Sequence, residues 1–315
     1  MKVLIVGGAG YVGGAVTDIL LAHPEHQIRV YDSLLYEDSY RKGVPFVRGD
    51  VRDRQLLLPH LQWADAVIWL AAIVGDAACA LDQEVSTAVN QSSVEWLAEV
   101  FPRRIIFLST CSVYGAADQV LDEQSATNPL SVYAVTKLAA ESFLAGHPSA
   151  LIFRLGTLFG LSDQFSRVRF DLVVNTLTLR AHQHNRISIF GGGQYRPLLH
   201  VRDAAEAVVR ALGHSQTGVY NIHRVNHRIS DLASQVAGHF PGLLVERTPT
   251  MFEDNRNYRV SSRKAEADLG FDPAQTVDQG IEEVRQLLVE GRLANPTSSR
   301  YWNDQFLAVR SGAQL

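Results

Sequence analysis

The chain has 315 residues, 46% of them hydrophobic and 20% charged, which is enough to bury the core of one large or two modest domains. Its 29 basic and 33 acidic residues are spread along the sequence and give a net charge of only −4. This balance argues against the basic stripe of a nucleic-acid-binding protein and against the polybasic patch of a membrane-surface protein.

Membrane, metal and disulfide classes are not indicated either. The longest apolar run, Ala66–Val74, is too short to cross a bilayer. Histidines such as His182 and His184 do not pair with carboxylates or cysteines at ligand spacing, so we predict no metal site. Two cysteines, Cys79 and Cys111, do not suggest a disulfide framework and favour a reducing cytoplasm.

The first predicted element is a buried strand, Lys2–Val6, which runs into the glycine-rich segment Gly7–Gly13 and then into an apolar helical pattern. Glycines at positions 7, 10 and 13 permit a sharp turn, close approach of a pyrophosphate to the backbone, and tight packing of helix on strand. Free N–H groups at the helix start would bind the phosphates. The segment therefore predicts a dinucleotide-binding site.

The second predicted strand, Ile28–Tyr31, ends in Asp32, nineteen residues after Gly13. A carboxylate there accepts hydrogen bonds from the adenosine ribose hydroxyls and repels a 2′-phosphate, so NAD is favoured over NADP. The nearby Arg41 and Lys42 keep NADP open as the alternative.

Strands and helices go on alternating, which predicts an α/β fold with a Rossmann-type doubly wound parallel sheet. The further predicted strands are residues 44–47, 66–72, 104–108 and 150–154, and a long helix is predicted around Glu84–Phe101. Ligands of such sheets bind beyond the carboxyl ends of the strands. We expect an NAD-binding domain over residues 1–156, with residues 198–222 returning to it, and a smaller substrate-binding region over residues 157–315. The tail from about Leu293 is expected to be loosely held.

Lys137 lies four positions after Tyr133, so on a helix the two residues lie on the same face. A fixed ammonium favours the phenolate, and we expect Lys137 to lower the pKa of Tyr133 from its usual value of about 10. Tyr133 could then take a proton from a hydroxyl while a hydride leaves the same carbon. The pair therefore predicts a hydride-transfer enzyme.

The motifs together resemble the extended short-chain dehydrogenase/reductases of the NAD-dependent epimerase/dehydratase family, which act on nucleotide sugars. They are Gly7–Gly13, Gly49–Asp53, Leu108–Gly115, Tyr133–Lys137, Arg154–Gly160, His200–Ala204, Tyr258–Ala265 and Leu269–Pro273. The resemblance makes Thr110 the third catalytic residue beside Tyr133 and Lys137. It implies the following NAD-binding residues: Gly7, Gly10, Tyr11, Val12, Gly13, Asp32, Asp50, Val51, Ala71, Ala72, Tyr133 and Lys137.

The two residues after Thr110 separate the possible reactions. Relatives that eliminate water carry an acidic pair there, and decarboxylating relatives carry a glutamate at the second position. This chain has Cys111 and Ser112, and neither is a strong general acid. Fucose-type epimerase/reductases have a cysteine at the Ser112 position; one residue earlier, Cys111 points to the opposite face and is expected to be a packed thiol. The reaction that remains is the transfer of a hydride to or from one carbon of the sugar.

For the diphosphate of a nucleotide sugar, the resemblance implies Asn175, Arg196, and Arg256 or Arg259. Guanidinium groups suit phosphate because they donate two parallel hydrogen bonds. Residues 190–197 depart from the family pattern by a one-residue deletion, and Pro197 replaces an aspartate.

The predicted function is an NAD-dependent nucleotide-sugar epimerase that oxidises a sugar hydroxyl, at C4, and reduces the ketone again. A 4-dehydrogenase or 4-ketoreductase without epimerisation is the alternative, and a non-catalytic dinucleotide-binding sensor is a third reading. The family also implies a homodimer that packs helices near residues 84–101 and 133–145.

Overall fold

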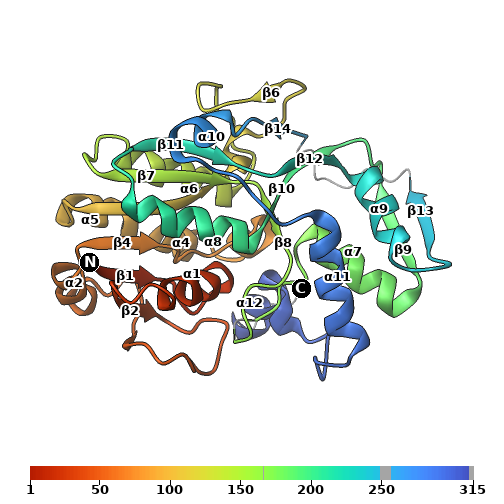
Figure 1. Ribbon diagram of the computed structural model, residues 1–315, viewed down its shortest axis with the longest axis horizontal. Coiled ribbons are helices and arrows are strands. Elements are labelled where there is room, and N and C mark those ends of the chain that lie inside the picture. Colours follow the sequence, from red (N-terminus) through yellow and green to blue (C-terminus); the bar gives the residue numbers. More distant parts are fainter. Residues whose placement is uncertain (166, 249–256, 312–315) are drawn as a thin grey trace.

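Seven parallel strands form the central sheet of the molecule, in the order β11-β7-β5-β4-β1-β2-β3. The computed structural model describes residues 1–165, 167–248 and 257–311 (Figure 1). The strands of this sheet are β1 (Lys2–Val6), β2 (Gln27–Asp32), β3 (Phe46–Arg48), β4 (Ala66–Trp69), β5 (Arg104–Thr110), β7 (Ala150–Leu155) and β11 (Gly218–Ile222). The predicted Rossmann-type doubly wound sheet is confirmed.

Helices cover both faces of this sheet, which explains why its strands are apolar without alternation. On β1, Val3 and Ile5 face one apolar core, and Leu4 and Val6 face the other. The first core includes α1 (Tyr11–Leu21), α8 (Val201–Arg210) and α10 (Arg263–Leu269). The second includes α2 (Arg54–Trp63), α5 (Ser93–Val100) and α6 (Val132–Leu144).

The predicted helix around residues 84–101 is present, but it contains a π-helical turn in the middle. Residues 83–87 form α4, residues 88–92 form the π turn η1, and α5 follows. Asn90 in this turn is buried, and its side chain bonds both the N–H and the carbonyl of Ile73. The turn therefore fixes the chain that leaves β4, which lines the cleft described below.

A second region packs around its own apolar core. It contains the sheet β12-β10-β8, the parallel pair β9 and β13, and three helices. The elements are β8 (Thr157–Phe159), α7 (Val173–His184), β9 (Arg186–Phe190), β10 (Tyr195–His200), β12 (Val225–Arg228), α9 (Ile229–Gly238), β13 (Leu244–Thr248) and α11 (Val277–Val289). A small pair, β6 (Val120–Leu121) with β14 (Arg259–Val260), lies near α10 in Figure 1.

The chain crosses between the two regions more than once. Strand β11 pairs with β7 at the edge of the large sheet, and α8 packs against α1. After the second region, α10 packs against β11 in the first core. Helix α8, strand β11 and helix α10 therefore all pack in the first core.

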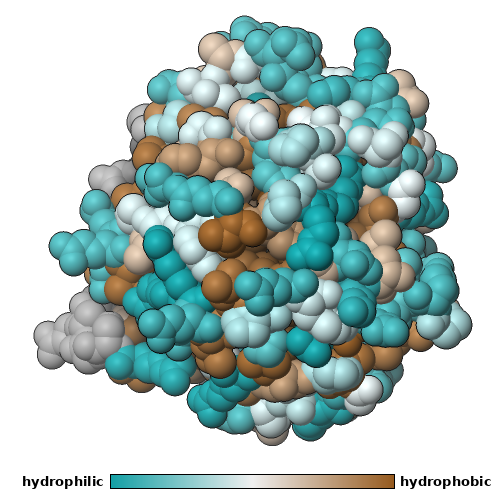
Figure 2. Space-filling view, turned by 90° about the vertical axis from the view of Figure 1, so that its left-hand side faces the viewer, coloured by the Kyte–Doolittle hydropathy of each residue, from teal (hydrophilic) through white to brown (hydrophobic). Residues whose placement is uncertain are grey.

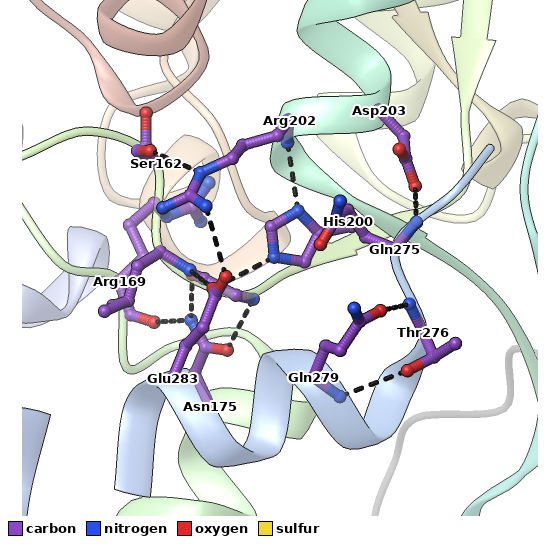
Figure 3. A network of polar contacts seen from close by, with 12 residues as sticks. Ser162, Arg169, Asn175, His200, Arg202, Asp203, Gln275, Thr276, Gln279 and Glu283 are labelled. Atoms are coloured by element: carbon purple, nitrogen blue, oxygen red, sulfur yellow. Dashed lines mark hydrogen bonds and ion pairs between the residues drawn. The ribbon is translucent and has the colours of Figure 1, made fainter. Parts of the chain in front are cut away.

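A buried polar network fixes the junction between β10, α8 and α11 (Figure 3). His200 ends β10 and caps α8: its Nδ1 accepts a hydrogen bond from Arg202 N, so Nε2 carries the proton that faces Glu283 Oε2 at 3.1 Å. Burial opposes ionisation of Glu283, but hydrogen bonds from His200 and from Leu161 N hold its pKa below the usual range. The network anchors the start of the loop after β8.

The described part of the C-terminal tail, up to residue 311, is anchored rather than loosely held, so the expectation was wrong for this part. Figure 1 shows its last helix, α12 (Asn303–Ser311), lying between the two regions, and α12 packs against α3 (Asp76–Leu81). Arg300, in the short turn η4 (Ser299–Tyr301), forms an ion pair with Glu37 at 3.1 Å. The tail thus closes onto the first region through contacts with residues far away in the sequence.

Figure 2 shows the side of the molecule that lies at the left in Figure 1. Hydrophilic residues cover much of this side, and hydrophobic residues reach the surface between them. Within residues 1–165, 167–248 and 257–311, none of the helices combines the length and the hydrophobicity that crossing a bilayer requires.

Candidate active site

A cleft of about 1580 Å³ lies beyond the carboxyl ends of β1, β2, β4 and β5, and residues of both regions line it. Pockets for single drug-sized ligands measure roughly 300–1,000 Å³, so this cleft has room for two such ligands. All the residues predicted to bind the cofactor line it, as do the three predicted catalytic residues. The sheet rule that placed them at one edge therefore brings them together.

The glycine-rich turn fits a dinucleotide closely. Gly7 has φ +90°, and a Cβ there would lie 2.5 Å from Ala71 N; a Cβ at Gly13 would lie 2.3 Å from Gly7 O. Gly10 caps α1 without any side-chain hydrogen bond, so the first N–H groups of α1 face the cleft with no competing side chain. Backbone N–H groups at a helix start suit a pyrophosphate.

Asp32 ends β2 at the position expected for ribose recognition. Its two carboxylate oxygens accept hydrogen bonds from Ala9 N (2.9 Å) and Leu34 N (2.8 Å), which hold the side chain against the turn. Burial raises its pKa above the usual range, although these hydrogen bonds oppose the shift. Asp32 lines the cleft beside Asp50, whose carboxylate is paired with Arg52 at 2.7 Å. The residues present therefore fit a dinucleotide.

Tyr133 and Lys137 are presented by the first turns of α6. Ser131 caps this helix through a hydrogen bond from Ala134 N, and its hydroxyl donates to Asp76 at 2.7 Å. The helix start is thereby tied to α3. Thr110, at the end of β5, is 8% exposed; its Oγ accepts from Ser112 N at 3.1 Å and keeps its own hydrogen to donate.

The pKa shifts in the ligand-free protein differ from expectation. Burial raises the pKa of the Tyr133 phenol, and nearby Cys79 adds to the shift, while Arg169 opposes it. Burial also lowers the pKa of Lys137 to about 7, against a smaller opposing effect of Glu141. The expectation that Lys137 depresses the pKa of Tyr133 was therefore wrong for this state: both groups are driven toward their neutral forms because the closed site desolvates them.

The residues after Thr110 lie as the sequence predicted. Cys111 is fully buried, donates to Arg154 O at 3.2 Å, and has its pKa raised by burial. It is a packed thiol and cannot act as an acid in the cleft. Ser112 lines the cleft, with its hydroxyl 3.3 Å from Tyr258 Oη.

The predicted diphosphate residues are not brought together. Arg196 lines the cleft, where it lies over the Tyr258 ring. Asn175 is fully buried behind the cleft wall, and its amide bonds the backbone of Gly160 and Arg169. Arg259 lies outside the cleft and donates to Asp118 O, and Arg256 falls outside the described residues.

Several cleft residues were missed by sequence reasoning. From the second region they are Thr176 and Arg180 of α7, with Arg167, Arg169 and Asp171 of the preceding loop; from the tail they are Trp302, Asn303, Asp304 and Leu307. The sequence could have revealed the loop, because it is an arginine-rich stretch directly before α7. The tail carried no local signal, because its contacts with the cleft join residues more than a hundred positions apart.

A glycine turn before α1, an acidic residue after β2, and a Thr–Tyr–Lys set in the same cleft define a dinucleotide-dependent oxidoreductase. The model of the NAD-dependent epimerase/dehydratase family matches residues 3–222. The chain therefore belongs to this family, which confirms the resemblance of its motifs, and its cofactor is NAD.

Curated relatives cover most of the chain. The UDP-glucose 4-epimerase of Halalkalibacterium halodurans is 29% identical over 310 residues, which are 87% of this chain and 91% of that protein. The UDP-glucose 4-epimerase of Corynebacterium glutamicum is 25% identical over 309 residues (88% and 92%). The dTDP-D-glucose 4,6-dehydratase of Mus musculus is 28% identical over 240 residues (70% and 67%).

Solved structures share the fold. The UDP-glucose 4-epimerase of Thermotoga maritima, in complex with UDP-glucose, has a TM-score of 0.81 at 21% identity and covers 93% of this chain and 100% of its own. MoeE5 in complex with UDP-glucose and NAD has a TM-score of 0.78 at 25% identity, with the same coverage.

Proposed function

We propose that this protein is an NAD-dependent nucleotide-sugar epimerase that inverts a sugar carbon, C4, by oxidation and reduction. The observation that carries the proposal is the convergence of Thr110, Tyr133 and Lys137 on one cleft with the glycine turn. A sensor that only binds the dinucleotide needs the turn and Asp32, but it does not need three catalytic groups beside them.

Tyr133 acts as the base in this proposal: it takes the proton of the reacting sugar hydroxyl and returns it in the reverse step. Thr110 donates its free hydrogen to the same sugar oxygen. Lys137, when protonated, stabilises the phenolate. When bound, NAD supplies the hydride acceptor and a positive charge beside the phenol. Thr110 and Lys137 are buried and Tyr133 is partly buried, and this limited contact with water strengthens the electrostatic effects among the three groups.

The second region supports a nucleotide diphosphate as the carrier of the sugar. Arg180 and Arg196 both line the cleft beyond the catalytic residues, and guanidinium groups bind phosphate by paired hydrogen bonds. Strand β9 contributes Ser188, Ile189 and Phe190 to the same end, which provides backbone and an aromatic ring for a base. The panel of nucleotide sugars described below identifies which nucleotide base binds there.

Loss of water, the reaction of the dehydratase relatives, is disfavoured by this site. Neither residue after Thr110 is a carboxylic acid: Cys111 is sealed behind the cleft, and Ser112 is a weak acid. A 4-dehydrogenase or 4-ketoreductase uses the same three groups and remains the second candidate.

The test is incubation of purified protein with NAD and a panel of UDP-, dTDP-, GDP- and CDP-sugars. An epimerase converts one sugar into its C4 epimer, seen by NMR, with little rise of absorbance at 340 nm because the cofactor is recycled. Stoichiometric NADH identifies the dehydrogenase instead. Absence of both products across the panel contradicts an enzyme of either kind.

Tyr133→Phe is the matched variant, since it removes one hydroxyl from the cleft. We expect kcat to fall by about 10²- to 10⁴-fold, the usual contribution of a general base, with NAD affinity changed by less than about twofold. Thr176→Val, which removes a cleft hydroxyl from α7, serves as the control. Equal losses in both variants would show that Tyr133 is not the base.

We also propose that the protein is a cytoplasmic homodimer. Its two cysteines are buried and free, which suits a reducing compartment. Helix α6 carries Val135 with 49% of its surface exposed, an apolar residue available to a second copy. Sedimentation of Val135→Glu beside the wild type tests the dimer, which the charge should weaken.

A further inference from the structure

Arg167 is a buried cation of the cleft that the proposed reaction leaves unused. Its side chain lines the cleft and the residue is 8% exposed. The guanidinium donates to two neutral acceptors, the Arg300 carbonyl and Asn303 Oδ1, and stacks over the Tyr36 ring at 4.0 Å. Among the described residues it has no carboxylate as an ion-pair partner.

The nearby carboxylates are already taken by other cations. Asp171 is held by Arg169 in a two-pronged ion pair with distances of 3.0 and 2.8 Å. Glu37 pairs with Arg300 at 3.1 Å. Buried charges are normally paired, so Arg167 leaves one positive charge of this cluster without compensation. Burial and the neighbouring Arg169 lower its pKa to about 10, and Tyr36, Asp171 and Glu37 oppose this shift only in part.

The position of Arg167 indicates which anion fits. Through Tyr36 it touches the loop that follows Asp32, the ribose end of the cofactor site. Arg169, two residues along the chain, lies 5.9 Å from the centre of the Tyr11 ring, at the start of α1. Between the ribose carboxylate and the start of α1 lies the pyrophosphate of a bound dinucleotide. In addition, the Tyr36 hydroxyl is buried here without a hydrogen-bond partner among the described residues.

We propose that Arg167 binds the pyrophosphate of NAD from the side opposite the glycine turn, and that the C-terminal strap, residues 299–311, holds it in place. The side chain of Asn303 accepts from Arg167 and donates to Val74 O at 2.7 Å, and the Asn303 backbone N–H donates to Asp171 Oδ2 at 3.3 Å. Phe306 packs on Tyr36 with ring centres 5.5 Å apart. The tail of the chain is thus part of the cofactor site.

The inference rests on NAD as the cofactor of the proposed function, and its test measures binding rather than turnover. Protein stripped of nucleotide is titrated with NAD, ADP-ribose and UDP by calorimetry. Arg167→Met should weaken NAD and ADP-ribose by about 10- to 100-fold, the range for lost charge-assisted hydrogen bonds, and leave UDP within about twofold. Arg292→Met is the control: it removes the same charge from an exposed ion pair with Glu290 outside the cleft.

Two further variants separate charge from folding. Arg167→Lys keeps the cation and should lose less NAD affinity than Arg167→Met. Asn303→Asp places a carboxylate against Arg167 and should weaken NAD by about tenfold, because the internal anion competes with the pyrophosphate. Unchanged NAD affinity in Arg167→Met and Asn303→Asp, or weakening of UDP alone, overturns the inference. A wild-type protein that binds no NAD contradicts the proposed function instead.

Discussion

At the scale of single residues, burial moves the two ionisable groups of α6 toward their neutral forms. Tyr133 must lose a proton and Lys137 must keep one for the proposed catalysis, so the ligand-free protein carries an electrostatic cost in this helix. The positive ring of the cofactor favours the Tyr133 phenolate and so offsets the part of that cost that falls on Tyr133, which makes the active state dependent on cofactor binding.

Replacing Lys137 by Met should therefore stabilise the fold while it abolishes activity. The pKa of Lys137 is about 7 in the folded protein and 10.5 as its ordinary value. This difference measures how much the charged ammonium destabilises the folded state. Below pH 7 both states are protonated and the cost is complete; between pH 7 and 10.5 only the unfolded state binds the proton, so the cost shrinks as the pH rises. Thermal melts should show the largest gain in Tm at pH 6 and almost none at pH 10.

Lys2→Met is the control for that series, because Lys2 is exposed and lies outside the cleft. Its effect on Tm should not vary with pH in the same way. A loss of stability in Lys137→Met across the whole range would mean that the ammonium is compensated in the folded protein.

The cleft arginines make a second residue-scale prediction. Arg196→Met should raise the KM for the nucleotide sugar by about 10- to 100-fold with kcat largely kept, since a phosphate contact far from the reacting carbon stabilises ground and transition states alike. Arg259→Met removes the same charge from outside the cleft and should change KM by less than about twofold. Steady-state kinetics of the two variants compares their KM values directly. A larger increase of KM in Arg259→Met would contradict the assignment of this cleft as the nucleotide-sugar site.

At the scale of elements, the strands were predictable because parallel strands buried on both faces are continuous apolar runs. The predicted strands at residues 66–72, 104–108 and 150–154 overlap β4, β5 and β7. The glycine turn, Asp32, Ala71 and Thr110 were predictable for the same reason, since each lies at or directly after the end of a strand. The π turn in the predicted helix 84–101 was not, because it depends on the bonds of Asn90 to a distant strand end.

The strap could not be predicted from the sequence. Its anchors are Arg300 to Glu37 and Asn303 to Val74, pairs separated by 263 and 229 residues, and no local pattern encodes such pairs. Likewise, a family motif placed Asn175 on the right helix but not the direction of its side chain, which is turned into the wall. A motif therefore predicts the position of an element better than it predicts the direction and role of a single side chain.

Hydrogen exchange tests the strap as an element. If residues 299–311 hold Arg167 over bound NAD, then NAD should slow exchange of their backbone amides, because opening of the strap would release the ligand as well. Helix α2 lies outside the cleft, and those of its amides that exchange through local opening should show the same exchange with and without NAD. Equal exchange in the strap in both states would show that it does not close on the cofactor.

At the scale of the whole molecule, the two regions are joined by side chains as well as by the chain. Tyr11 Oη of α1 donates to Gly160 O at 2.6 Å, and Asp203 of α8 accepts from the backbone N–H groups of Ala274 and Gln275. The His200–Glu283 pair lies at the same junction (Figure 3). Since buried polar groups lose these partners if one region unfolds alone, each region stabilises the other.

We therefore expect one cooperative unfolding transition, and NAD should shift all of it. At a concentration of 100 times Kd, a ligand adds about 2.7 kcal/mol, or about 5 °C in a protein of this size. Calorimetry with NAD checks this. Fluorescence of Trp69 in β4 and of Trp302 in the strap should report the same midpoint. Two transitions, of which NAD raises only one, would mean that the regions fold independently and that the cleft between them is not fixed before ligands bind.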